Sequence, residues 1–232
     1  MSQPIEPIRI SKIMASRGIA SRTEADRMIE RGWVSVDGRV AASGDRALPD
    51  AEIVLSKEAQ SRIDDAFTVV LNKPRGFVSS PDETNGARAL GLLVHENYCG
   101  LGQAPNLSAY GLRVAGRLAV SESGLVVYTT DTALARRLAA SDVEESWTIT
   151  FLDDSDDIND AAARIVAALQ LSGQEARIST TAARTVSLDT SSLVKGQLSE
   201  VLSSFALRAS VMRTRRGEIA LGDVTEAQWR LA

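Results

Sequence analysis

A two-residue turn between two alternating segments constrains the N-terminal part of this chain most strongly. Residues 33–36 (Trp-Val-Ser-Val) alternate as a strand does, Asp37-Gly38 is a strong hairpin-turn pair, and Arg39-Val40 begins the return strand. Before the hairpin, residues 8–29 carry apolar side chains at helical spacing with an interruption at Gly18. The sequence therefore predicts a small helix–helix–hairpin module.

The second predicted helix has its own start signal. Ser21 is the expected N-cap residue, and Glu24, three residues later, completes a capping box. A further strand is expected at residues 52–55, after the turn at Pro49-Asp50. These signals place the end of the module near residue 58.

Charge is unevenly distributed along the 232 residues. The net charge of −4 and the isoelectric point near 5.2 argue mildly against nucleic-acid binding, which needs Lys and Arg. Residues 1–48, however, carry eight basic against six acidic side chains, a net charge of +2 that leaves −6 on the remainder. Lys12, Arg17, Arg22 and Arg27 can line one helical face. This face is either a local RNA-binding patch or a solvated surface, as most charge clusters are.

The remainder of the chain predicts an α+β domain. Residues 59–65 are polar and are expected to be a linker between a first domain at 1–58 and a second at 66–232. Strands and helices then follow without a repeating βαβ rhythm, which favours a mainly antiparallel sheet. The strands are expected at 67–71, 125–130, 147–151, 185–188 and 218–221, and the helices at 132–138, 160–171 and 199–205.

The N-terminal module resembles a known RNA-binding domain. Arg9-Ile10-Ser11-Lys12, residues 18–22, Gly32, residues 34–36 and Asp37-Gly38-Arg39 match the pattern of the S4 domain. The resemblance implies that structured RNA is the partner. It also implies phosphate contacts from the basic side chains Lys12, Arg17, Arg22 and Arg27.

Three segments of the second domain resemble the bacterial ribosomal-RNA pseudouridine synthases of the RsuA/RluB type. They are residues 71–76 (Leu-Asn-Lys-Pro-Arg-Gly), residues 116–119 (Gly-Arg-Leu-Ala) with the following Gly124-Leu125, and residues 213–215 (Arg-Thr-Arg). The resemblance implies a pseudouridine synthase fold with no metal or organic cofactor. It also implies that the basic residues Lys73, Arg75 and Arg117 line a cleft that meets RNA. Arg213 and Arg215, which match family residues, are expected either to contact RNA or to be solvated at a strand edge.

The departures from this family fall on its functional positions. Ala119 stands where the family has its catalytic aspartate, and a methyl group cannot attack a nucleoside. Trp147 takes the place of a tyrosine, and its indole nitrogen only donates. Glu145 replaces a lysine, and in the C-terminal motif Glu200 and Leu202 stand at positions of a glutamine and a basic residue. We therefore expect the chain to be catalytically inactive.

Several alternatives remain at this stage. An engineered Asp→Ala substitution at position 119 is disfavoured because several active-site positions differ together. Rescue by the nearby Glu122 is disfavoured because the supporting tyrosine and basic residues are missing as well. His95 and Cys99 have a spacing that could suit a metal on a helix, but Gly100 and Gly102 favour a loop, so no metal site is expected.

Three functions are consistent with the sequence. The first is a catalytically silent RNA-binding protein, with ribosomal RNA as the expected partner. The second is an active enzyme, or an engineered form of one, that converts a uridine of ribosomal RNA to pseudouridine. The third is a protein-interaction scaffold that no longer binds RNA. A cytoplasmic location is expected, because the chain has one cysteine, no signal-peptide pattern and no apolar run of membrane-spanning length. A monomer is expected as well.

Overall fold

A computed structural model describes residues 6–20, 22–64, 66–80, 83, 85–105, 107, 112–153, 157–191 and 193–232. The chain forms two compact units. The N-terminal unit comprises residues 1–67 with 130–134, and the C-terminal unit comprises residues 68–129 with 135–232. Within the described residues, no helix is both long enough and apolar enough to cross a membrane.

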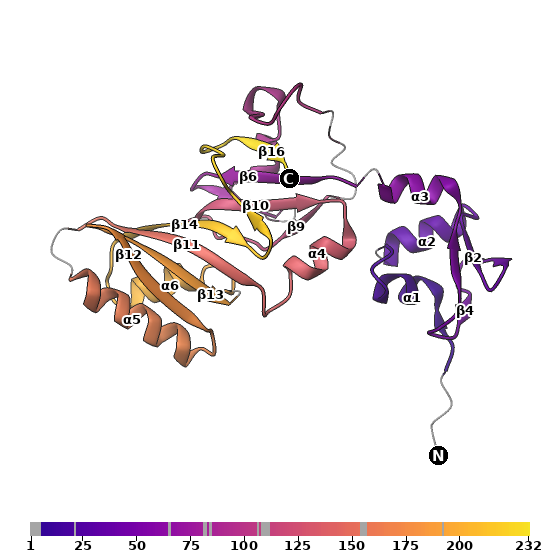
Figure 1. Ribbon diagram of the computed structural model, residues 1–232, viewed down its shortest axis with the longest axis horizontal. Helices are drawn as coiled ribbons and strands as arrows, with labels where there is room; N and C mark the ends of the chain where they lie inside the picture. The colour runs from indigo at the N-terminus through magenta and orange to yellow at the C-terminus, as the bar shows by residue number, and fades with distance from the viewer. Residues whose placement is uncertain are drawn as a thin grey trace, which may run out of the picture. The chain divides into compact units, whose positions relative to one another are not determined.

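The N-terminal unit contains the predicted helix–helix–hairpin module (Figure 1). Buried side chains of both helices, among them Met14 and Ile29, pack with Val34 of the first hairpin strand in one core. The strands form a three-stranded antiparallel sheet in the order β3-β2-β5 and a separate β1-β4 pair. The elements are β1 (Ile8–Arg9), α1 (Ile10–Ser16), α2 (Arg22–Glu30), β2 (Val34–Val36), β3 (Arg39–Val40), β4 (Arg46–Ala47), β5 (Ile53–Leu55) and α3 (Lys57–Asp64).

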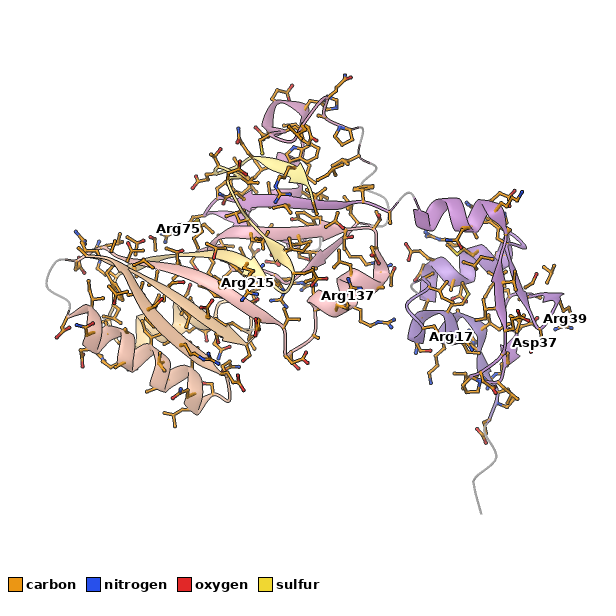
Figure 2. All side chains as sticks on the ribbon, viewed as in Figure 1. Arg17, Asp37, Arg39, Arg75, Arg137 and Arg215 are labelled. Atoms are coloured by element: carbon orange, nitrogen blue, oxygen red, sulfur yellow. The ribbon has the colours of Figure 1, made fainter. Side chains whose placement is uncertain are left out.

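The hairpin turn and the helix break are confirmed. Asp37 and Gly38 both have positive φ, 49° and 78°, as a two-residue type I′ turn requires. The Asp37 side chain, labelled in Figure 2, also accepts a hydrogen bond from the backbone N–H of Glu52 at 2.9 Å. Gly18, between α1 and α2, has a φ of 75°. The N-cap predicted at Ser21 lies outside the described residues.

The segment expected as a linker is largely helical. Residues 57–64, which include most of the segment expected as a linker, form helix α3. Ser56 accepts a hydrogen bond from the Ala59 N–H at 3.3 Å, and Ala59 is buried in the core of the N-terminal unit. A short helix that contributes one small side chain to a core keeps a mostly polar composition, which hides it from a hydrophobicity pattern.

The C-terminal unit is built on a nine-stranded sheet (Figure 1). The strand order is β12-β13-β11-β14-β10-β6-β16, with β15 beside β14 and β9 beside β10. All these pairs are antiparallel except β10 with β14, which confirms a mainly antiparallel α+β domain. The strands are β6 (Thr68–Lys73), β9 (Arg113–Ala115), β10 (Ser123–Thr129), β11 (Glu144–Phe151), β12 (Ala176–Ala182), β13 (Thr185–Ser191), β14 (Ala209–Arg216), β15 (Ile219–Ala220) and β16 (Trp229–Leu231).

Three helices accompany this sheet, close to where the sequence predicts them. They are α4 (Thr132–Leu138), α5 (Ile158–Leu171) and α6 (Gln197–Ser204). Asp157 caps α5 by accepting hydrogen bonds from the backbone N–H groups of Asn159 and Asp160. Helix α5 packs on β12, and α6 packs on α5 and β14 (Figure 1). Smaller elements are the parallel pair β7 (Phe77–Val78) and β8 (Ala87–Arg88) and two 3₁₀ turns, η1 (Ala89–Leu92) and η2 (His95–Asn97).

Candidate catalytic loop and nucleic-acid interface

The loop that contains Ala119 joins two paired strands, β9 and β10. Its backbone is held at both ends of the turn. Ser79 exchanges hydrogen bonds with Leu118, accepting from its N–H at 3.0 Å and donating to its carbonyl at 3.1 Å. Gly116 has a φ of 79°, and a Cβ at this position would overlap the Arg216 side chain. The loop therefore has a fixed geometry that depends on a glycine at position 116.

Position 119 lies against the start of α6. A Cβ built on Gly196, the residue before that helix, would be 3.6 Å from the Ala119 Cβ. The Ser121 and Ser199 hydroxyls are 3.1 Å apart and share a hydrogen bond. The Ser199 hydroxyl also donates to Glu122 Oε1 at 3.5 Å, and Glu122 Oε2 accepts from the Ala119 N–H at 2.8 Å. Glu122 is 1% exposed, so its carboxylate anchors the loop and does not face solvent.

The two departures predicted in α6 have different surroundings. Leu202 is 4% exposed and belongs to the buried apolar side chains, whereas Glu200 is exposed. Burial accounts for the leucine as a packing residue. Nothing in the structure explains the glutamate.

Glu145, Arg213 and Arg216 form a buried ionic triad. Glu145 Oε1 accepts hydrogen bonds from Arg213, at 3.1 Å, and from Arg216. Glu145 Oε2 accepts from the Trp147 indole N–H at 3.0 Å and from the Leu193 N–H at 3.4 Å. Glu145, Arg213 and Arg216 are 0%, 1% and 4% exposed. The negative charge of Glu145 thus neutralises two interior arginines.

Three of the predicted site residues are interior groups. Trp147 is 2% exposed, with the Arg213 guanidinium 5.5 Å from its ring centre, so it presents no face to a base. Arg213 donates to Glu145 and to the carbonyls of Gly116 and Leu125. Arg213, for which contact with RNA is expected from the sequence, is thus committed to interior partners in this structure.

Lys73 is the third of these interior groups. It is 0% exposed, and its ammonium donates to the carbonyls of Pro74, Phe77 and Glu122 at 2.7–2.9 Å. Burial lowers the pKa of Lys73 to about 8, and the nearby negative charge of Glu122 opposes that shift. In this structure the Lys73 ammonium therefore holds backbone carbonyls, including that of Glu122 in the loop, and is not presented at the surface.

The other three predicted basic residues of the C-terminal unit are at least partly exposed. Arg215 is half-buried, donates to Ser146 Oγ at 3.1 Å and pairs with Glu144 at 3.3 Å. Arg75, labelled in Figure 2, and Arg117 are exposed. Arg75 precedes Gly76, whose N–H donates to the Val120 carbonyl at 2.8 Å, so the turn carrying Arg75 adjoins the loop carrying Arg117.

The N-terminal unit contains a strongly basic pocket of about 260 Å³. Two of its cations, Lys12 and Arg22, are predicted site residues. The other predicted pair, Arg17 and Arg27, does not line it, and the Arg17 guanidinium donates to the Pro49 carbonyl at 2.6 Å. The pocket is lined by Ile8, Arg9, Ser11, Lys12, Arg22, Asp26 and Arg46.

Two cations of this pocket are missing from the predicted site. Arg9 and Arg46 are register partners in the β1-β4 pair, which brings them together across 37 positions of sequence. Each strand has only two residues, too few for an alternation pattern to reveal the pairing. The S4-like motif that contains Arg9 was the one signal that could have pointed to it.

Metal-binding groups do not gather in the described part of the chain. No cluster there of three or more His, Cys, Asp or Glu residues could hold a metal ion. His95 begins the 3₁₀ turn η2, and the Cys99 thiol lies 3.4 Å from the Trp229 carbonyl oxygen.

Comparison with known proteins agrees with both parts of this geometry. Residues 8–53 match the S4 domain family. The chain is 34% identical over 143 residues to an uncharacterized RNA pseudouridine synthase of Mycobacterium leprae, covering 61% of this chain and 53% of that protein. This chain is a homologue of RNA pseudouridine synthases.

Further similarities extend the comparison. Ribosomal large subunit pseudouridine synthase B of Yersinia pestis is 28% identical over 159 residues, which cover 64% of this chain and 46% of that protein. The chain spans about half the length of the curated relatives it matches. The fold is also similar to a crystal structure of a pseudouridylate synthase. The match covers 97% of this chain and 96% of the chain in that structure, with a TM-score of 0.58 and 19% sequence identity. This structural likeness supports the pseudouridine synthase fold.

Proposed function

We propose that this homologue of the pseudouridine synthases binds RNA but does not isomerise uridine. The observation that carries the proposal is the composition of the catalytic loop, where Ala119 occupies the position of the family's nucleophile. The loop around it is intact, fixed by Ser79 on one side and by Glu122 on the other. The loss therefore concerns the reacting group, while the scaffold that would present it persists.

Neighbouring residues do not supply a replacement nucleophile. Both oxygens of Glu122 accept hydrogen bonds within the loop and from Ser199, and the side chain is 1% exposed. Trp147 is buried and offers only an N–H donor, which already binds Glu145. Covalent catalysis needs an accessible nucleophile and a group that moves protons at the base. Neither role is filled at the positions that correspond to the family's site.

RNA binding is retained in this proposal. The S4 domain contributes four cations around one pocket, and Arg75 and Arg117 add exposed positive charge on and beside the loop of the C-terminal unit. The name of the Yersinia relative supports ribosomal RNA as the partner, which would place the protein in the cytoplasm.

The loss of isomerisation is tested by tritium release. Isomerisation of uridine breaks the bond between C5 and its hydrogen, so ribosomal RNA tritiated at uridine C5 reports each turnover. Purified protein should release no tritium above a protein-free control. Release above that control would identify the chain as an active uridine isomerase, the alternative favoured by the names of its relatives.

Binding through the S4 pocket is tested with a charge reversal. Arg22→Glu should weaken binding to ribosomal RNA and reduce the salt dependence of the binding constant, because each lost phosphate contact lowers the logarithmic slope by roughly 0.7–0.9. Arg39→Glu is the matched control, since Arg39 is 81% exposed, lies in the same unit and pairs with Asp45 outside the pocket. Equal effects of the two substitutions, or no RNA binding by the wild type, would favour a protein-interaction scaffold.

A further inference from the structure

The basic pocket of the S4 domain contains one carboxylate, Asp26. Asp26 and Arg22 are four residues apart in α2, so both lie on the same helical face. Lys12 reaches the pocket from α1, and Arg9 and Arg46 reach it from the β1-β4 pair. One acidic side chain thus lines the same pocket as four cationic ones.

Asp26 is not used to neutralise those cations. Among the residues that the structure describes, the side chains of Arg9, Lys12, Arg22 and Asp26 make no ion pair or hydrogen bond with one another or with any other group. The Arg46 guanidinium donates to the Pro7 carbonyl at 3.4 Å. The pocket therefore presents uncommitted donors and one uncommitted acceptor.

A bare carboxylate is unfavourable in a pocket that binds phosphate alone. It has only acceptor oxygens, and its negative charge repels a phosphate held a few ångströms away. Asp26 becomes favourable when the ligand carries a hydrogen-bond donor close to its phosphate. In RNA, the ribose 2′-hydroxyl is such a donor next to every phosphate, whatever the base.

We propose that Asp26 accepts a hydrogen bond from the 2′-hydroxyl of a nucleotide whose phosphate lies among Arg9, Lys12, Arg22 and Arg46. The inference rests on the proposed RNA-binding function and adds a selectivity to it. The pocket selects RNA over a nucleic acid that lacks the hydroxyl, and it does so independently of base sequence.

The size of the pocket agrees with this ligand. Its volume of about 260 Å³ is slightly below the range of roughly 300–1,000 Å³ typical of small-molecule sites. One sugar–phosphate unit suits such a recess better than a stack of bases. In addition, none of the residues lining it is aromatic, and aromatic side chains are what single-stranded bases usually stack on.

The test compares two stem–loop RNAs of identical sequence, one with ribose and one with 2′-fluoro sugars. The fluorine keeps an RNA-like sugar pucker but cannot donate a hydrogen bond. Dissociation constants are measured with the full chain at low salt for the wild type, Asp26→Asn and Asp26→Ala. Glu30→Ala is the control, because Glu30 is an exposed acidic residue of the same helix that does not line the pocket.

The wild type should bind the hydroxyl form roughly tenfold more tightly, as expected for a hydrogen bond to a charged group. Asp26→Asn keeps an acceptor oxygen and should keep most of the preference. Asp26→Ala should abolish the preference and bind the fluoro form more tightly than the wild type does, because a repulsive charge is gone. Glu30→Ala should keep the wild-type ratio.

Two results overturn the inference in distinguishable ways. If the wild type binds both RNAs equally, or if Asp26→Ala keeps the preference, RNA binding stands and Asp26 does not read the hydroxyl. If the wild type binds neither RNA, the proposed function itself falls. Circular dichroism of each variant checks that the helices are retained.

Discussion

The carboxylate of Glu145 is the common acceptor of two interior guanidiniums, so Glu145→Gln removes their counter-charge with almost no change in volume. Burial lowers the pKa of Arg213 and of Arg216 to about 10, and both therefore stay cationic at neutral pH. The substituted amide also turns a donor toward a site that is surrounded by donors, including the Trp147 N–H. Two positive charges would then be buried without the carboxylate that accepts their hydrogen bonds.

The expected loss follows from the burial of the group. Removing one partner of a fully buried ion pair costs about 3–5 kcal/mol of unfolding free energy, because the remaining charge has neither water nor a counter-ion. Glu144→Gln is the matched control. Glu144 is the neighbouring residue, but its pair with Arg215 is 76% and 37% exposed, and such surface pairs contribute about 0–1 kcal/mol.

Urea unfolding followed by tryptophan fluorescence measures the difference, since Trp147 and Trp229 both lie buried in the C-terminal unit. For a slope of about 2–3 kcal/mol per molar urea, Glu145→Gln should lower the midpoint by about 1–2 M, and Glu144→Gln by less than about 0.5 M. Equal midpoints for the two variants would refute the reasoning that the triad supports the unit.

Three further substitutions test the loop and the strands that hold it. The unfolded pKa of Lys73 is 10.5 and its folded value is about 8, so the unfolded chain binds more protons in that range, and the free energy of unfolding should rise from about pH 8 to about pH 10. Lys73→Met should remove this rise, measured by urea unfolding at a series of pH values. If the unfolding free energy of the variant rises with pH as steeply as that of the wild type, Lys73 is not its cause. Gly124→Ala should lower the unfolding free energy by about 3 kcal/mol or more, because φ is 98° and the new Cβ would overlap the Arg213 backbone. The control Gly173→Ala, with a φ of 86° but open space around the Cβ, should lower it by about 1–2 kcal/mol. Equal shifts in melting temperature for the two variants would argue against the close approach at Gly124. Ala119→Asp should leave tritium release at background, because the new carboxylate would lie beside Glu122 without a base to assist it, and measurable release would show that one residue alone blocks the chemistry.

The parts of the fold that the sequence predicts well are those with local causes. The turn at Asp37-Gly38 needs positive φ at two neighbouring residues, and these residue types tolerate it. The helix at 132–138 is also found at the predicted bounds. Each signal lies inside the element that it specifies.

Strand β14 shows where local signals fail. It lies between β11 and β10 in the sheet, yet its sequence carries three arginines and predicts no buried strand. Arg213 and Arg216 are tolerated inside because Glu145, on a neighbouring strand 68 and 71 positions earlier, accepts their hydrogen bonds. A long-range partner thus reverses the exposure that a charged residue has by default.

The candidate site also has one part with a local sequence signal and one part without. The motif around Ala119 is contiguous, so its departure from the family pattern is readable from the sequence. The basic pocket is not contiguous, because Arg9 and Arg46 meet through two-residue strands and Lys12 and Arg22 come from different helices. The expectation of a single basic helical face therefore included two of its cations, Lys12 and Arg22, together with Arg17 and Arg27, which do not line it.

Tritium release under single-turnover conditions tests the central claim most directly. With protein in excess over ribosomal RNA tritiated at uridine C5, even one slow turnover per RNA would be counted. Release equal to the protein-free control, from RNA that the same protein sample retains on a filter, is the predicted result. Release that approaches one tritium per RNA would contradict the claim that Ala119 marks a loop without catalysis.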